Sequence, residues 1–166
     1  MLGLSVGLLA ACTPTPEPTP TPTALFASDE EAYAAAEETY RAYNDAINAQ
    51  RSGDITQDPQ DFLIGAALEA DIDGRRELAA SGLNVEGDVR VVAFTPIESA
   101  VTKDRRHVGA FVCLDLSKTQ VLLDNGDRAD LPDRPPVIAQ EVEMSWIDGN
   151  YRISAELDAE VAQCNA

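Results

Sequence analysis

The sequence predicts an α+β domain in which helices come first and mostly antiparallel strands follow. Three observations lead to this class. Up to about residue 81, apolar residues recur every three or four positions, as they do in helices. From Val85 onward they alternate with polar residues, as they do in strands. Asp148-Gly149, which lies between two such stretches, is typical of a tight hairpin turn.

The first expected helix begins at Ser28 and runs to about Ser52. Ser28 and Glu31 have the spacing of a capping box, in which a serine N-cap is followed three residues later by a glutamate. Gly53 then supplies a stop signal. The apolar stripe that should face the core consists of Tyr33, Ala36, Tyr40, Tyr43 and Ile47.

Two shorter helices and a run of strands should complete the domain. Asp58-Pro59 marks the start of the second helix, because proline is favoured at the first helical position. Gly74 should break this helix, and a further short helix from Arg75 should end at Gly82. The expected strands are residues 85–95, 105–116, 121–123, 137–147 and 151–154.

The segment before the domain indicates a membrane anchor. Residues 1–11 are apolar and uncharged, like the apolar region of a secretory signal, but too few to span a bilayer. Leu9-Ala10-Ala11-Cys12 resembles the lipobox of bacterial lipoproteins, in which one apolar and two small residues precede an invariant cysteine. The resemblance implies cleavage between Ala11 and Cys12 and attachment of diacylglycerol to the Cys12 sulfur. Two acyl chains would hold the protein at the extracytoplasmic face of the cell membrane.

One feature departs from the usual signal. No Lys or Arg precedes the apolar run, although signals normally begin with positive charge, so we expect the true start codon further upstream. The alternative is a frayed apolar N-terminus with an incidental cysteine.

Residues 12–27 should connect this anchor to the domain, which comprises residues 28–166. Thr13–Thr23 reads TPTPEPTPTPT, and proline at alternate positions excludes a helix or a central strand. The segment should sample extended polyproline II, and residues 13–27 would then reach about 45 Å at about 3.1 Å per residue. We therefore expect a semi-rigid stalk.

Composition excludes several classes of function. The 12 basic and 29 acidic residues give a net charge of −17, which would repel nucleic acid and an anionic membrane surface. Nucleic acid is therefore not an expected partner. The single histidine, His107, rules out multi-histidine metal sites. The acidic turns at 71–74 and 124–127 do not continue into calcium loops, and no phosphate-binding loop or other cofactor motif is present.

Three segments carry a family resemblance: Ser28–Ala49, Ala110–Ser117 and Gln140–Ser154. In layout the chain resembles actinobacterial lipoproteins with a domain of the nuclear transport factor 2-like superfamily, also called the cystatin-like cone. The resemblance implies a long N-terminal helix lying in a strongly curved, mostly antiparallel sheet. It rests on pattern and on no catalytic signature.

The two cysteines of the domain suit a compartment outside the cytoplasm. Cys113 falls in an expected strand and Cys164 lies near the C-terminus, so a disulfide between them would pin the C-terminal tail across the sheet. Two buried free thiols are the alternative.

Enzymes of this superfamily place aromatic hydroxyls and a carboxylate or histidine in the mouth of the curved sheet. Residues of these types make Tyr40, Tyr43, Asp115 and Trp146 candidates for ligand binding. His107 is a further candidate, although an exposed strand edge is its simpler explanation. Core packing likewise explains the tyrosine spacing, so we assign no catalytic residue.

Two functions remain open. The first is a non-catalytic domain, tethered to the membrane by its lipid, that binds a small ligand or an envelope protein. The second is a small-molecule isomerase or hydratase that uses the cone as its pocket. Asp115 or His107 within hydrogen-bond reach of Tyr40 would favour the enzyme, whereas a cone filled by aromatic side chains would favour the binding domain. A homodimer is compatible with either. We favour the binding domain because the sequence shows no catalytic site.

Overall fold

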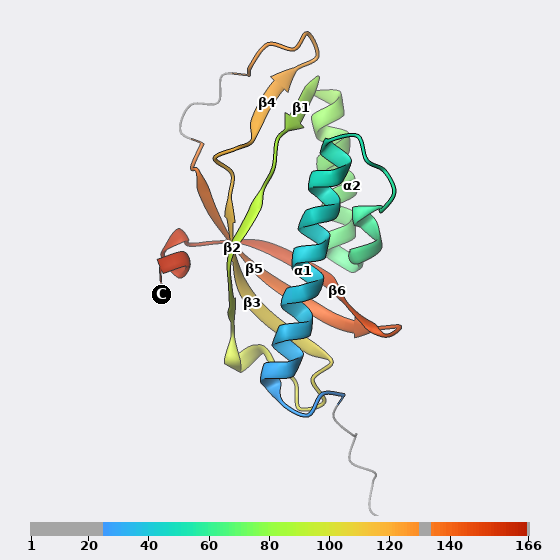
Figure 1. The fold of residues 1–166 in the computed structure, drawn as a ribbon, viewed down its shortest axis with the longest axis vertical. Coiled ribbons are helices and arrows are strands. Elements are labelled where there is room, and N and C mark those ends of the chain that lie inside the picture. The colour runs from blue at the N-terminus through green and yellow to red at the C-terminus, as the bar shows by residue number, and fades with distance from the viewer. Residues whose placement is uncertain (1–24, 130–133, 166) are drawn as a thin grey trace, which may run out of the picture.

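The computed structural model describes residues 25–129 and 134–165, and in these ranges the chain has the predicted α+β fold. Helices α1 (Asp29–Arg51) and α2 (Gly65–Ala80) lie on one side of the strands, whereas the C-terminal 3-10 helix η3 (Val161–Asn165) lies on the other (Figure 1). The expected signal, Cys12 and the stalk up to residue 24 lie outside the described residues.

Four antiparallel strands form the main sheet, in the order β2–β3–β5–β6. Their bounds are β2 Arg90–Pro96, β3 His107–Asp115, β5 Val137–Ile147 and β6 Asn150–Ala159. Register shifts mark two β-bulges, one between Val91 and Ala93 in β2 and one between Ile153 and Ala155 in β6. Because bulges bend a sheet and increase its twist, they curve this one around α1.

A separate two-stranded sheet, β1 (Leu83–Glu86) paired with β4 (Gln120–Leu123), stands above the main sheet in Figure 1. The single strand expected over residues 85–95 is therefore wrong, since β1 and β2 belong to different sheets. Gly87 separates them with a positive φ of 86°. A Cβ there would lie 2.1 Å from the carbonyl oxygen of Lys118, so the chain can turn at this point only with glycine.

Helix α1 has the predicted bounds and the predicted buried face. The Glu31 backbone N–H donates to Ser28 Oγ at 3.2 Å, which makes Ser28 the N-cap. At the other end, Gly53 adopts a φ of 90° after the helix. The stripe residues Tyr33, Ala36, Tyr40 and Tyr43 are all buried.

The second helical region differs from the prediction. Asp58-Pro59 begins only a 3-10 turn, η1 (Pro59–Phe62), and Leu63 then pairs with Ile153 of β6 before α2 starts. The predicted break at Gly74 is also wrong, because α2 continues through it. No heavy atom lies within 4 Å of the place where a Gly74 Cβ would be, so this glycine lies on an unpacked side of α2. Its cost of about 1 kcal/mol relative to alanine is outweighed by the packing of α2 against β6.

The cysteine pair attaches the C-terminal segment to the sheet. The sulfur atoms of Cys113 and Cys164 are 2.07 Å apart, which is consistent with the predicted disulfide. Cys113 is fully buried on β3, and its neighbour Val112 belongs to the core beneath α1. Since adjacent strand residues point to opposite faces, the disulfide holds η3 on the outer face of the sheet.

Candidate functional site

Aromatic side chains fill the space between α1 and the main sheet. The rings of Tyr40 and Tyr43 are 5.8 Å apart, with Phe94 and Phe62 next to them. Nearer the N-terminal end of α1, a second aromatic group consists of Phe26, Trp146 and Tyr151. The cone therefore has a packed interior at these two levels.

One carboxylate enters this interior, and a β-bulge puts it there. In β6, Tyr151 and Ile153 are buried, so simple alternation would bring Ala155 and Leu157 inward next. The ladder shifts between Ile153 and Ala155, which leaves Ser154 as the extra residue. After it the faces are exchanged. Leu157 is 59% exposed, and Glu156 points toward α1.

Glu156 forms a hydrogen-bonded group with Tyr40 and Gln140. The Tyr40 hydroxyl oxygen lies 2.9 Å from Glu156 Oε1 and 3.2 Å from Gln140 Oε1. A phenol has one hydrogen and can donate it fully to only one of these acceptors. The Tyr40 hydroxyl is therefore one donor that the acceptors Glu156 and Gln140 share.

The surroundings of this group shift the pKa of its acids. Burial raises the pKa of Glu156 above its ordinary value, and the Asp71 carboxylate adds to the rise, although the Tyr40 and Tyr43 hydroxyls oppose it. Burial likewise raises the pKa of Tyr40 and Tyr43 well above 10, and Glu156 contributes to both shifts. Burial thus opposes ionisation of all three groups.

The structure brings only part of the predicted site together. Tyr40 and Tyr43 are neighbours, but Trp146 belongs to the second aromatic group. Asp115 pairs with Arg90 on the adjacent strand and accepts from the Ser117 backbone N–H at 2.8 Å; these bonds, chiefly the Ser117 contacts, hold its pKa well below its usual range.

His107 and Glu156 also distinguish the observed site from the predicted one. His107 is exposed, and its Nδ1 lies 2.9 Å from Ser145 Oγ, so it is not a partner of Tyr40 in the described contacts. Glu156 is the carboxylate that reaches Tyr40, and it was not among the predicted site residues because the expected strand ended at Ser154.

Five clefts lie on the surface of the described residues, away from Glu156. Their volumes range from about 410 to 620 Å³, and the largest lies beside α1, with Tyr33, Phe94 and Val101 in its lining and Glu30 and Glu98 around them. Tyr40, Tyr43 and Glu156 are absent from the linings of these five clefts. In residues 25–129 and 134–165, no group of three or more His, Cys, Asp or Glu side chains is placed to hold a metal ion. No helix in those ranges is long and apolar enough to cross a membrane.

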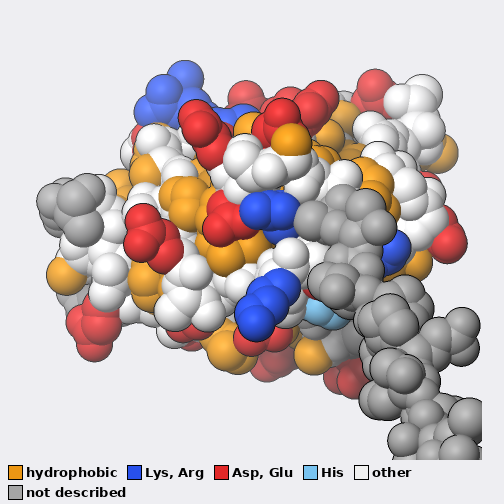
Figure 2. Space-filling view, turned by 90° about the horizontal axis from the view of Figure 1, so that it is seen from below, with side chains coloured by type: hydrophobic (Ala, Val, Ile, Leu, Met, Phe, Trp, Pro, Cys, Tyr) orange, Lys and Arg blue, Asp and Glu red, His pale blue; other side chains and the backbone are white. Residues whose placement is uncertain are grey.

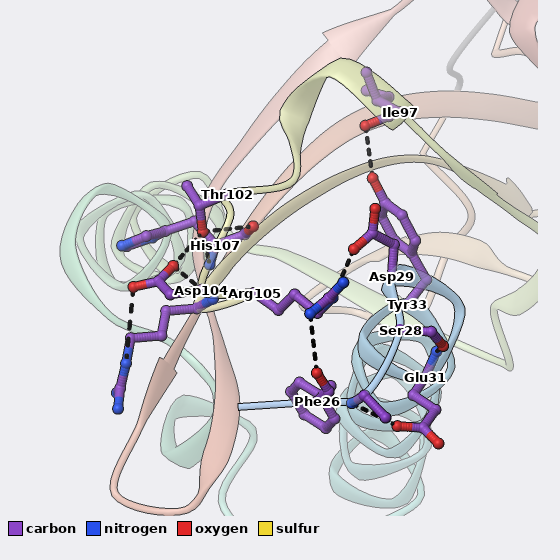
Figure 3. A network of polar contacts seen from close by, with 12 residues as sticks. Phe26, Ser28, Asp29, Glu31, Tyr33, Ile97, Thr102, Asp104, Arg105 and His107 are labelled. Atoms are coloured by element: carbon purple, nitrogen blue, oxygen red, sulfur yellow. Dashed lines mark hydrogen bonds and ion pairs between the residues drawn. The ribbon is translucent and has the colours of Figure 1, made fainter. Parts of the chain in front are cut away.

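Arg105 fixes the point at which the stalk would join the domain (Figure 3). Its Nε donates to Asp29 Oδ1 at 2.6 Å, and its Nη1 donates to the Phe26 carbonyl at 3.0 Å. The Arg105 carbonyl in turn accepts from the Tyr151 hydroxyl at 2.6 Å. Arg105 has a positive φ of 55°, which is strained for a residue with a side chain. Its three hydrogen bonds stabilise this backbone conformation.

Figure 2 views the molecule from this lower end, where acidic and basic side chains surround exposed hydrophobic ones. At this end, the Leu25 backbone N–H also donates to the Asp104 carbonyl at 3.2 Å. Together with the bonds of Arg105, this contact holds residues 25–29 to the 104–105 loop.

No protein-family model and no curated protein matches the sequence. Among solved structures, the chain is similar to the intermembrane space region of the chloroplast protein ARC6, with 15% identity and a TM-score of 0.46 over 80% of this chain and 98% of that one. It is also similar to Aln2 from a Streptomyces species, with 12% identity and a TM-score of 0.48 over 81% and 94% of the two chains.

A putative polyketide cyclase from Xanthomonas campestris pv. campestris is similar at 13% identity and a TM-score of 0.38, over 82% of this chain and 96% of that one. At such identities and TM-scores the likeness concerns the fold at most. It assigns no activity to this chain.

Proposed function

We propose that this protein is a bacterial lipoprotein, anchored by Cys12 to the extracytoplasmic face of the cell membrane, whose domain binds a ligand or an envelope protein without catalysis. The packed interior carries the proposal. Where a cone enzyme would hold its substrate, Tyr40, Tyr43 and Phe94 lie against one another. Asp115 and His107, the residues expected to act with Tyr40 in an enzyme, have other partners.

The attachment of residues 25–29 supports a tether with a defined direction. Arg105 holds the chain at the N-terminal end of α1, so the stalk would leave the domain there. With 23 residues, α1 is about 35 Å long, at about 1.5 Å per residue. Its C-terminal end would consequently point away from the lipid and toward soluble partners.

The enzyme alternative has one observation in its favour. Glu156, whose pKa is raised, lies beside the Tyr40 phenol, and a carboxylic acid kept neutral beside a phenol can stabilise an enolate, as in the known example of ketosteroid isomerase. Such a mechanism needs a substrate next to Glu156, but none of the measured clefts reaches that residue. The packed geometry thus supports the binding domain better.

Membrane fractionation tests the proposed anchor. The wild-type chain and a Cys12→Ser variant are produced in a bacterium, and the membranes are washed with alkaline carbonate. We expect wild type to stay in the membrane until detergent is added, and the variant to retain its uncleaved signal and carry no lipid label. Equal labelling of both chains with radioactive palmitate would contradict the role of Cys12.

A further inference from the structure

Arg51 occupies an unusual position for a charged residue. It comes four residues after Ile47 and eight after Tyr43, so it continues the stripe of α1 that faces the sheet. Its Nη1 atom is buried and has no hydrogen-bond partner. Among the described residues, Arg51 also has no ion-pair partner within 4.0 Å.

Two more arginines approach the same end of α1. Arg75 of α2 donates from Nη1 to Gln50, the residue next to Arg51, and from Nε to Asp71 Oδ2 at 2.7 Å. Arg134, which precedes β5, donates to the Thr119 side chain and carbonyl. Burial lowers the pKa of Arg51, and the nearby Arg75 and Arg134 charges add to this effect.

Contacts between the segments that carry these arginines place the segments next to one another. Near the end of α1, Asn48 exchanges two hydrogen bonds with Val89, at 2.8 and 3.0 Å. Two residues earlier, Gly87 packs on Lys118 and Thr119. Thr119 holds Arg134, so the α1 terminus, the β1–β2 connection and the segment before β5 form one continuous patch.

Among the described residues, the arginines outnumber the carboxylates that act on them. Asp71 already accepts from Arg75, and Asp88 is the carboxylate that raises the pKa of Arg51. Arg51 is partly buried, and a buried guanidinium nitrogen without a partner costs free energy, because it loses its hydration without gaining a hydrogen bond. In a chain of net charge −17, three of the twelve basic residues lie in this patch.

We propose that Arg51, Arg75 and Arg134 form a binding site for a small oxyanion, a ligand with a carboxylate or phosphate group. Guanidinium groups offer planar pairs of N–H donors that match both groups, and the free Arg51 Nη1 is the donor that such a ligand would satisfy. The site would be the ligand site of the proposed binding domain and in this respect rests on that proposed function. It lies at the end of α1 opposite the stalk.

Calorimetric titration of the detergent-solubilised full chain tests this site. Inorganic phosphate and succinate are the two probes, and they distinguish a phosphate from a carboxylate ligand. Vesicles of phosphatidylglycerol form a third arm, which tests a lipid headgroup as the source. We expect one or both soluble probes to bind and to raise the midpoint of thermal unfolding.

Arg51→Met keeps the length of the side chain and removes its donors. We expect this variant to weaken binding at least about tenfold, as is typical when a charged hydrogen bond is lost. Arg76→Met is the matched control, because Arg76 neighbours Arg75 on α2 but its side chain is 75% exposed and pairs only with Asp73. This control should bind like wild type.

Stability without a ligand separates a binding role from a structural one. If the role of Arg51 is to bind a ligand, Arg51→Met should be at least as stable as wild type in the absence of ligand. The substitution removes a partly buried guanidinium whose Nη1 has no partner. A destabilised variant that still binds as wild type does would overturn the proposal, and so would wild type that binds neither soluble probe. Binding to vesicles alone would contradict a small-molecule site. The lipid state of Cys12 is measured separately, so failure of this site leaves the anchor in place, and failure of the anchor leaves oxyanion binding in place.

Discussion

The hydroxyl oxygen of Tyr40, on the long helix, lies 2.9 Å from a carboxyl oxygen of Glu156, on the last strand. This contact depends on the extra residue Ser154, which turns Glu156 inward. In the described part of the chain, the space between α1 and the sheet therefore holds the carboxyl group of Glu156, which lies beside a phenol and an amide. Its consequences for stability can be measured.

Glu156→Gln should change how stability depends on pH. The raised pKa means that the folded protein keeps its proton at a pH where the unfolded chain has released it. Wild-type stability from this group is thus complete below pH 4.5, the ordinary pKa, and declines as the pH rises through the folded pKa. Glutamine cannot ionise and should lack this decline.

Urea unfolding between pH 4 and pH 8 checks this prediction. The free energy of unfolding of Glu156→Gln, minus that of wild type, should increase as the pH rises. Glu143→Gln is the control, because Glu143 is exposed on the neighbouring strand. A constant difference between wild type and Glu156→Gln over the whole range would contradict the prediction, because it would mean that the pKa of Glu156 does not change on folding.

Tyr40→Phe should destabilise the domain by about 1 to 3 kcal/mol, the usual cost of leaving a buried polar group without its partner. The ring would still fill its place, but Glu156 and Gln140 would lose the hydroxyl that joins them. Tyr33→Phe is a useful comparison, because its hydroxyl donates only to the Ile97 carbonyl at a partly buried position. We expect the smaller loss there, measured by urea unfolding at pH 7. Equal losses would argue against a special role for the Glu156 group.

Removing the disulfide should lower stability by about 4 kcal/mol. Cys113 and Cys164 are separated by 51 residues, and the estimate is the loop entropy that the bond removes from the unfolded chain. Denaturant unfolding of Cys113→Ala/Cys164→Ala, with and without dithiothreitol, measures it. The reductant should destabilise wild type and leave the double variant unchanged. A reductant-insensitive wild type would mean that the two cysteines are not bonded.

Arg105→Met should loosen the junction between stalk and domain. It removes the donors to Asp29 and Phe26 while leaving the backbone carbonyl that accepts from Tyr151. For a partly exposed contact of about 1 kcal/mol, amide exchange in residues 25–31 should become about fivefold faster.

Hydrogen exchange read by mass spectrometry resolves this segment from the rest of α1. Arg106→Met is the matched variant, because Arg106 has only a 3.9 Å contact with Asp104 among the described ion pairs. Faster exchange throughout α1 in Arg105→Met would show a general loss of stability instead of a local one.

The parts of the fold that the sequence predicts well are those with local signals. Ser28 and Gly53 define the ends of α1, and the strand expected over residues 137–147 is β5. The hairpin turn is also confirmed, since both Asp148 and Gly149 have a positive φ, as a tight turn of this kind requires.

Long-range contacts decide the parts that were mispredicted. The turn at Gly87 depends on the distant Lys118 carbonyl, and Gly74 is tolerated because α2 packs along β6 on its other side. In the site, the pattern Tyr151, Ile153, Leu157 predicts an apolar inner face for β6. Only the bulge at Ser154 reverses it, and nothing local in the sequence marks that bulge.

The mass of the intact protein, extracted from bacterial membranes with detergent, tests the central claim most directly. A lipid-anchored domain predicts a polypeptide that begins at Cys12, with the mass of a diacylglyceryl group added and that of two hydrogens subtracted for the disulfide. Fragmentation should place the lipid on Cys12. An unmodified polypeptide that begins at Met1 would contradict the account.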